Sequence, residues 1–317
     1  MELLLLEWLG KPVWMWAGFL TVVIALLALD LGLFNRRDHE IGVRESLALS
    51  AFYVAVALAF GAWLWSSQGA DSAVEYLTAY AVEKSLAMDN VFVIALIFSA
   101  FSVPRLYQHR VLFWGVLGVI VLRAIMIGGG AVLVARYHWV LYLFAGFLIL
   151  TGVKMFFARG EETDIADNAL LKWFRRRMRV TNDLHGHAFF VRTKSRRSGE
   201  VKLHATPLFL ALVTIEIADV IFAVDSVPAV FAITTDAYVV YTSNIFAILG
   251  LRALYFALAA VIHRFAYLKQ ALAVLLVFIG GKVFAAPLLG IEKVPPAVSL
   301  SVTAAILATG VVWSLWR

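Results

Sequence analysis

Two acidic segments, each inside a long apolar run, contain the residues of this chain that are best suited to chemistry. The first reads EKSLAMDNVFV (83–93) and the second reads DVIFAVDSVPAV (219–230). A charged side chain at the centre of a membrane span costs about 2.5–3.5 kcal/mol by insertion scales. Two such segments with matching spacing therefore indicate an ion or proton pathway. Aligned, they give three residue pairs: Glu83 with Asp219, Asp89 with Asp225, and Asn90 with Ser226.

The acidic residues are expected to follow one another along a path instead of surrounding one ion. Six residues of an ideal helix rise about 9 Å and turn to another face, so Glu83 and Asp89 do not readily chelate one ion together. The two spans run in opposite directions. Glu216 and Asp219 are therefore expected on the cytoplasmic side of Asp225. Glu83 is expected on the outer side of Asp89, which gives a ladder suited to the passage of a cation.

Two arginines offer counter-ions for the central aspartates. Arg123 and Arg252 lie near the centres of the spans that follow the two acidic segments. Buried ionisable groups in membranes commonly pair, so structural salt bridges with Asp89 and Asp225 are the plain interpretation. We expect both roles at once: the arginines neutralise the site, and the aspartates carry the function.

Further polar residues and one proline are candidates for ligands or for structural roles. Pro228 frees a carbonyl one turn earlier, which either binds a cation or only marks a kink. Asp30 is either an interfacial residue or a further ligand, and Asn244 is expected to bond a neighbouring helix. We assign Lys154 and Lys282 a structural role, because lysines near span ends can snorkel to the interface.

The donor atoms of these spans narrow the cargo to hard cations. They are carboxylates, an amide, a hydroxyl and carbonyls, and the chain has no cysteine. Its histidines fall in loops or at span boundaries. Oxygen ligands suit Mg²⁺, Ca²⁺ and Mn²⁺, whereas zinc or copper would call for His, Cys or clustered Met. The residues alone therefore identify the cargo only as a hard divalent cation.

The composition predicts an all-α polytopic membrane protein. Of the 317 residues, 62% are hydrophobic and 15% are charged, and runs of about twenty apolar residues can cross a bilayer core. The third and sixth runs are long, so tilted or broken helices are expected there. The first span lacks a basic leader and is expected to be retained. Nine runs are predicted: 13–34, 45–65, 73–101, 110–134, 138–158, 205–233, 240–262, 268–286 and 296–316.

Spans three to five and six to eight resemble a repeated three-helix unit. Besides the acidic segments, VLRA around Arg123 matches GLRA around Arg252, and TGVKMF matches IGGKVF. Because each unit has an odd number of spans, the two enter the membrane from opposite sides, as in inverted-repeat secondary transporters. The predicted parts are two first helices (1–66), repeat one (73–158), a basic loop (159–204), repeat two (205–287) and a last helix (295–317).

The net charge of +6 sets topology and does not suggest a nucleic-acid partner. With the N-terminus outside, the inner segments hold 19 Lys and Arg and the outer segments hold three, which is a positive-inside pattern. The C-terminus and the 159–204 loop are therefore expected in the cytoplasm. Within that loop, 167–180 is expected to be an interfacial helix against anionic lipid, followed by a short hairpin with its turn near Ser198.

The same motifs resemble the TerC family of bacterial membrane proteins, most closely its Alx-type members. EKSLAMDNVFV, EIADVIFAVDSVPAVFA and TSNIFAILGLRALYF carry the resemblance, with the repeated arginine and lysine elements. The similarity runs over nearly the whole chain. The family is named for tellurite resistance, and its Alx-type members are associated with manganese export and alkaline response. The resemblance thus implies Mn²⁺ efflux, with Asp89, Asn90, Asp225 and Ser226 at the acidic motifs.

The residues, together with this resemblance, predict a secondary transporter of the bacterial inner membrane that exports Mn²⁺ in exchange for protons, with no enzymatic activity and no cofactor. Carboxylates must shed protons to bind a divalent cation, so proton coupling is available. The sequence has no GxxxxGK[ST] nucleotide-binding loop. Two other functions stay open. One is a membrane assembly or metal-delivery partner for secreted proteins, working through 159–204. The other, which the surrounding residues favour less, is an intramembrane aspartic protease with Asp89 and Asp225 as its dyad.

Overall fold

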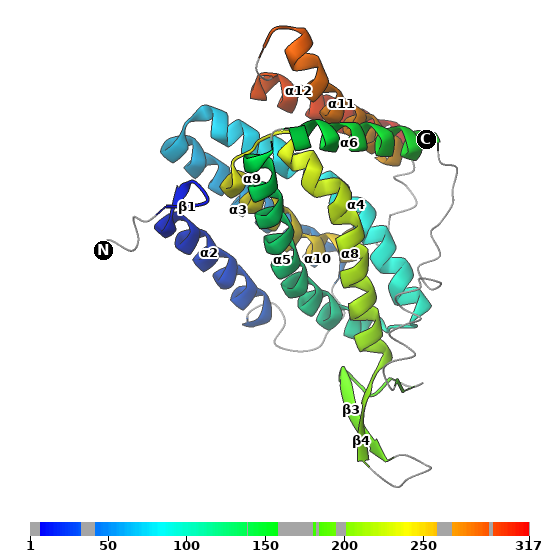
Figure 1. The fold of residues 1–317 in the computed structure, drawn as a ribbon. Helices are drawn as coiled ribbons and strands as arrows, with labels where there is room; N and C mark the ends of the chain where they lie inside the picture. Colours follow the sequence, from blue (N-terminus) through cyan, green and yellow to red (C-terminus); the bar gives the residue numbers. More distant parts are fainter. Residues whose placement is uncertain are drawn as a thin grey trace.

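The chain folds into a bundle of helices with two small β-hairpins (Figure 1). The computed structural model describes residues 7–32, 42–137, 139–157, 180–181, 184–194, 201–258, 268–291 and 294–316. The described residues include four strands, β1 (Glu7–Trp8), β2 (Lys11–Pro12), β3 (Phe190–Lys194) and β4 (Val201–Ala205). They also form ten helices: α2 (Val13–Gly32), α3 (Val43–Gln68), α4 (Ala70–Ala100), α5 (Arg105–Arg136), α6 (Trp139–Phe157), α8 (Pro207–Phe231), α9 (Ala237–Leu249), α10 (Leu251–Leu258), α11 (Leu268–Leu288) and α12 (Pro296–Trp316).

The helices are those of an all-α polytopic membrane protein, as predicted. Seven helical stretches in the described parts of the chain are long and apolar enough to cross a membrane, with α9 and α10 counted together, and α2 contributes the shorter apolar stretch Val13–Leu29. The 31 residues of α4 are also long enough, but this helix carries more charge, including Glu83, Lys84 and Asp89. Each of the nine apolar runs found in the sequence falls on a helix or on the α9–α10 pair.

The broken helix is not where the sequence placed it. The third and sixth runs form the continuous helices α4 and α8, and Pro228 lies inside α8. The break falls instead in the seventh run, at Gly250 between α9 and α10. A Cβ at Gly250 would lie 2.7 Å from Nζ of Lys84, so glycine lets this side chain pass close to the backbone. Lys84 Nζ donates to the carbonyl of Ala247 at 3.2 Å, which satisfies the open end of α9.

Helices α4, α5, α8 and α9 form the centre of the bundle. Helix α4 packs against α8 and α9, and α5 packs against the same two helices. All 13 residues of α9 are buried. One cluster of aromatic side chains lies where α2, α3 and α4 pack on α9, and it includes Phe19, Phe60, Tyr76, Tyr238 and Phe246.

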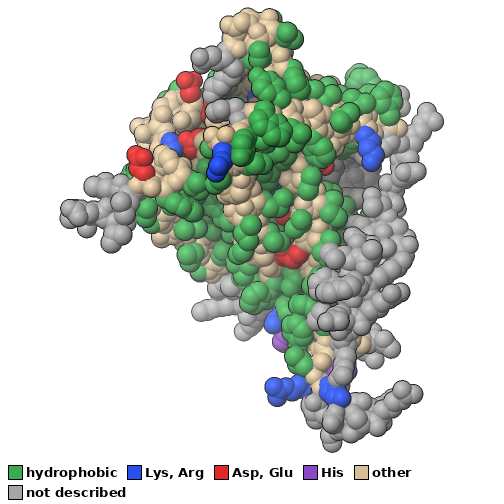
Figure 2. Space-filling model, viewed as in Figure 1, with side chains coloured by type: hydrophobic (Ala, Val, Ile, Leu, Met, Phe, Trp, Pro, Cys, Tyr) green, Lys and Arg blue, Asp and Glu red, His purple; other side chains and the backbone are tan. Residues whose placement is uncertain are grey.

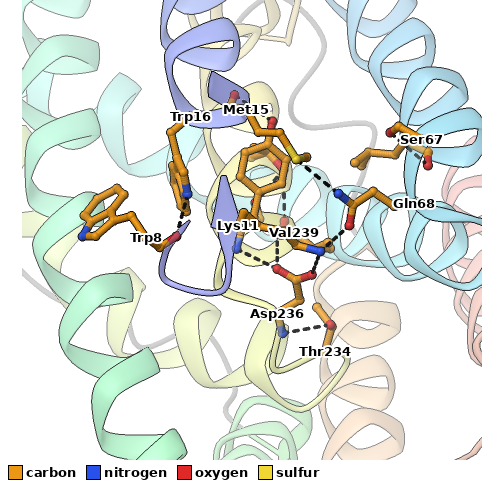
Figure 3. Close-up of polar contacts among 12 residues, drawn as sticks. Trp8, Lys11, Met15, Trp16, Ser67, Gln68, Thr234, Asp236 and Val239 are labelled. Carbon is orange, nitrogen blue, oxygen red and sulfur yellow. Dashed lines mark hydrogen bonds and ion pairs between the residues drawn. The ribbon is translucent and has the colours of Figure 1, made fainter. Parts of the chain in front are cut away.

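The amino-terminal β1–β2 hairpin is anchored on α9 (Figure 3). Lys11 forms an ion pair with Asp236 Oδ2 at 2.9 Å and a hydrogen bond with Gln68 at the end of α3. Asp236 is the N-cap of α9, where its Oδ1 accepts from the backbone N–H of Tyr238 at 2.9 Å. This carboxylate therefore caps one helix and holds the start of the chain against it.

The predicted hairpin in the basic loop is present. Strands β3 and β4 pair antiparallel, with Phe190 opposite Ala205 and Lys194 opposite Val201. In Figure 1 the hairpin projects from the start of α8, away from the helices. The turn expected near Ser198 and the interfacial helix expected at 167–180 lie outside the described residues, apart from Val180.

Helices α6 and α11 meet backbone to backbone through two reciprocal glycine contacts. A Cβ at Gly152 of α6 would lie 2.7 Å from the carbonyl oxygen of Ala273, and a Cβ at Gly280 of α11 would lie 2.5 Å from that of Ala145. Glycine and its contact are seven residues apart in both helices. Neither position has room for a methyl group unless the helices separate.

We therefore expect Gly280→Ala to destabilise the protein, with Gly281→Ala as its matched control. Overpacking costs about 1–3 kcal/mol, whereas a Cβ at Gly281 meets nothing within 4 Å. At the control position alanine should raise the stability by roughly 0.5–1 kcal/mol, because alanine is more favourable than glycine inside a helix. Thermal unfolding in detergent measures both variants. Equal stability of the two would show that α6 and α11 are not in close contact.

Candidate functional site: a buried arginine between two carboxylates

The candidate site is built around Arg123, near the middle of α5. Its side chain is 1% exposed, and it is among the largest fully buried side chains of the described residues. A buried guanidinium must be paired, because moving a charge out of water costs several kcal/mol even after relaxation. The residues around Arg123 supply that pairing from three other helices.

Two carboxylates of the acidic segments bind this one guanidinium. Arg123 donates from Nη1 to Glu83 Oε1 at 2.7 Å, from α5 to α4. It also donates from Nε and Nη2 to the two oxygens of Asp219 on α8, at 3.1 and 3.0 Å. The second contact is bidentate, which is the strongest geometry of an arginine–carboxylate pair. Glu83 is 1% and Asp219 is 7% exposed.

Two neutral oxygens also accept hydrogen bonds from Nη1, the nitrogen that binds Glu83. Nη1 of Arg123 also donates to Oγ of Ser226 on α8 at 2.7 Å and to Oδ1 of Asn244 on α9 at 3.3 Å. Asn244 thus bonds a neighbouring helix, as the sequence predicted. All four central helices therefore meet at one side chain.

Two atoms of this network are left without a partner. Oε2 of Glu83 and Nδ2 of Asn244 are buried and have no hydrogen-bond partner among the residues that the structure describes. Buried polar atoms are almost always satisfied, and each exception asks for an explanation. With both acids ionised, two carboxylates and one guanidinium leave a net charge of −1.

A small cavity lies beside the network. Its volume is about 30 Å³, and three polar side chains line it among apolar ones: Asn90, Asp219 and Arg252. This is room for one or two water-sized groups. The buried Arg252 thus faces the same space as Asp219, although it comes from α10.

The ion pairs of Arg123 differ from those predicted. The sequence paired the arginines with Asp89 and Asp225, whereas Arg123 binds Glu83 and Asp219. The half-buried Asp225 instead accepts from the hydroxyl of Thr151 on α6 at 3.3 Å. The side chain of Asp89 lies outside the described residues.

The predicted ladder is therefore wrong for two of its members. It separated Glu83 and Asp219 onto opposite sides of the centre, but both bind one guanidinium. The prediction counted the helical rise along each span from Asp89 and Asp225, which it placed at the same depth. Arg123 instead contacts α4 at Glu83, six residues before Asp89, and contacts α8 at both Asp219 and Ser226.

Glu216 lies three residues from Asp219 and faces the same helix, α5, at another position. Its carboxyl group packs against Gly118, where a Cβ would overlap it. Its Oε2 is buried and has no hydrogen-bond partner among the described residues. On the face of the molecule over α5 and α8, Figure 2 shows a few side-chain atoms of Asp or Glu among apolar side chains.

The other residues that the sequence singled out lie apart from the network. Lys282 donates to Ser299 on α12 at 3.2 Å, and Lys154 is exposed near the end of α6. Pro228 is buried within α8. Asp30 is in α2, and its side chain lies outside the described part of the chain. Among the described residues, no group of three His, Cys, Asp or Glu is arranged to hold a metal ion.

Sequence reasoning missed two contacts next to the acidic segments. Thr151 is part of TGVKMF, where the matching position of the second repeat is Ile279, so this single polar difference was a usable signal. Lys84 follows Glu83 in the chain, and consecutive residues of a helix point to different faces. Lys84 therefore reaches α9 while Glu83 reaches α5.

We expect Ser226→Ala to lower stability, with Ser243→Ala as its control. A hydrogen bond to a charged group contributes about 1.5–3 kcal/mol, and Ser226 accepts from the guanidinium at 2.7 Å. Ser243 is also fully buried, but its hydroxyl donates only to carbonyls of its own helix, at 2.7 and 3.1 Å. Thermal unfolding of the two purified variants should differ. Similar losses would mean that Ser226 is only a packing residue.

Comparison of the sequence with known proteins places the chain in a family of membrane proteins. Residues 68–317 match the model of the integral membrane protein TerC family. An uncharacterized membrane protein of Myxococcus xanthus is 48% identical over 96% of this chain and 93% of its own. Alx of Escherichia coli K12, provisionally named a membrane-bound redox modulator, is 47% identical over 97% and 95%. No solved structure matches. The chain belongs to the TerC family.

Proposed function

We propose that this protein is a secondary transporter that exports Mn²⁺ from the cytoplasm in exchange for protons. The observation that carries the proposal is the pair of buried carboxylates on one guanidinium, with one carboxylate oxygen unpartnered, at the centre of a membrane bundle. Ionisable groups at this depth mark ion or proton pathways. The cavity beside Asp219 gives the path a place to continue.

The donor set supports a hard divalent cation as the cargo. The network offers carboxylate, hydroxyl and amide oxygens from Glu83, Asp219, Ser226 and Asn244. Such oxygens suit Mn²⁺, Mg²⁺ and Ca²⁺, and the choice of Mn²⁺ rests on the resemblance of the acidic motifs to Alx-type proteins. The name of Alx refers to redox modulation. Thiol–disulfide exchange is not open to this chain, which has no cysteine.

An inverted repeat would give the transporter its alternating access. Such a repeat requires that helix contacts recur when the two units are exchanged. If the two units are exchanged, α8 takes the place of α4 and α9 takes the place of α5. The α5–α8 contact then corresponds to the α9–α4 contact. The glycine contacts of α6 and α11 exchange in the same way, since Gly152 and Gly280 occupy the same place in TGVK and IGGK. Rocking of one unit against the other around a fixed central site is the motion that this arrangement supports.

Proton exchange follows from the same carboxylates. A divalent cation binds ionised carboxylates, so its release leaves groups that can take up protons. In this proposal Asp89, Asn90 and Asp225 extend the path from the central network. The alternative, an assembly or metal-delivery partner that works through 159–204, predicts that deletion of this loop abolishes the function while the central acids are dispensable.

Neutralising the acids should abolish manganese export without removing the protein from the membrane. We expect Glu83→Gln, Asp219→Asn, Asp89→Asn and Asp225→Asn each to reduce export at least tenfold, because amides keep the volume but lose the charge. Asp71→Asn, at the exposed start of α4, is the control and should export normally. Cellular manganese content and protein abundance are measured together. Normal export by all four variants at normal abundance would refute the central site.

The orientation is tested by reporter fusions. The charge distribution places the N-terminus outside and both the basic loop and the C-terminus in the cytoplasm. Fusions of a cytoplasmic reporter after Arg197 and after Arg317 should both be active, and a periplasmic reporter at the same sites should be silent. A periplasmic signal at either position contradicts this orientation, and with it the direction of export.

A further inference from the structure

We propose that Nη1 of Arg123 occupies a cation-binding site formed by Glu83, Ser226 and Asn244, and that the transported ion binds by displacing it. This inference rests on the proposed function and names the ligands and the competitor at its centre. Arg123 then acts as a tethered cation, neutralising the site while no ion is bound.

Three oxygens from three helices converge on this one nitrogen. The distances from Nη1 are 2.7 Å to the carboxylate of Glu83, 2.7 Å to the hydroxyl of Ser226 and 3.3 Å to the amide oxygen of Asn244. Carboxylate, hydroxyl and amide oxygens are the donor types that a hard divalent cation takes from proteins. An NH₂ group of an arginine offers only two protons to these three acceptors. The oxygens are therefore arranged around the nitrogen as ligands are around an ion.

The unpartnered oxygen of Glu83 fits the same assignment. Oε2 is buried on a side chain that is 1% exposed, and nothing in the described structure donates to it. A metal ion can bind both oxygens of a carboxylate at once, whereas Nη1 reaches only Oε1. Displacement of Nη1 by an ion would satisfy the oxygen that the arginine leaves over.

The two carboxylates hold Arg123 unequally, which tells how the displacement would occur. Asp219 binds the guanidinium through two hydrogen bonds, to Nε and Nη2, and Glu83 binds it through one. The single contact is the weaker one. Arg123 can therefore stay on Asp219 while Glu83, Ser226 and Asn244 turn to the ion.

The charge of the network limits how tightly the ion is held. The network carries −1 with both acids ionised, so a divalent ion brings it to +1. Arg252 and Asp219 line the same small cavity beside the network. The ion is thus held less tightly than two free carboxylates would hold it, and release remains possible on each transport cycle.

The test is Mn²⁺ binding to the purified full-length protein, followed by the spectrum of free Mn²⁺ in electron paramagnetic resonance. Arg123→Gln should bind Mn²⁺ at least tenfold more tightly than the wild type and should export it at least tenfold more slowly. Glu83→Gln added to Arg123→Gln should abolish the gain. Arg136→Gln, at the exposed outer end of α5, is the matched control and should bind like the wild type.

A second variant keeps the test decisive if Arg123→Gln does not fold. Arg123→Lys keeps the charge but cannot span both carboxylates, so its affinity should lie between those of the wild type and the glutamine variant. If the wild type binds and exports Mn²⁺ but neither folded variant binds it more tightly, Arg123 is not a competitor and this inference fails alone. If the wild type neither binds nor exports Mn²⁺, the proposed function itself fails.

Discussion

The constraint on which the structure depends is that a guanidinium and two carboxylates must be kept out of water together. Removing one partner of a buried ion pair costs about 3–5 kcal/mol, because the other charge is left uncompensated. Arg123, Glu83 and Asp219 come from three helices, and Asn244 adds a fourth. The positions of α4, α5, α8 and α9 are therefore coupled through one side chain, and any motion that separates them must first supply another positive charge.

Small residues and a helix break make this convergence possible. Gly118 leaves room for Glu216 against α5, and the glycines of α6 and α11 let that pair approach at backbone distance. Gly250 ends α9 where Lys84 passes. A larger residue at Gly152 or Gly280 would push α6 and α11 apart, whereas at Gly118 or Gly250 it would displace the end of a charged side chain.

The sequence predicted the elements well and the pairing between them poorly. Apolar runs locate membrane helices reliably because the bilayer fixes their length. Glu83 and Asp219, which the acidic segments singled out, meet at Arg123. Which charges meet depends on helix crossing points, which no run of residues encodes by itself. The pairing of Arg123 with Glu83 and Asp219 is such a case. The break at Gly250 was missed because length and Pro228 pointed to other helices, whereas the decisive feature was a lysine on α4.

Helix α9 shows how the network is held in register. It is only 13 residues long and wholly buried, so its two ends cannot be satisfied by water. Asp236 caps its amino end and is itself held by Lys11, while Lys84 binds the carbonyl of Ala247 near its carboxyl end. A negative charge at the first end and a positive one at the last both match the helix dipole. These contacts fix the axial position of α9 and therefore the distance of Asn244 from Arg123. Because Lys84 is adjacent to Glu83 on α4, a shift of α4 would move the end of α9 and the carboxylate of the site together.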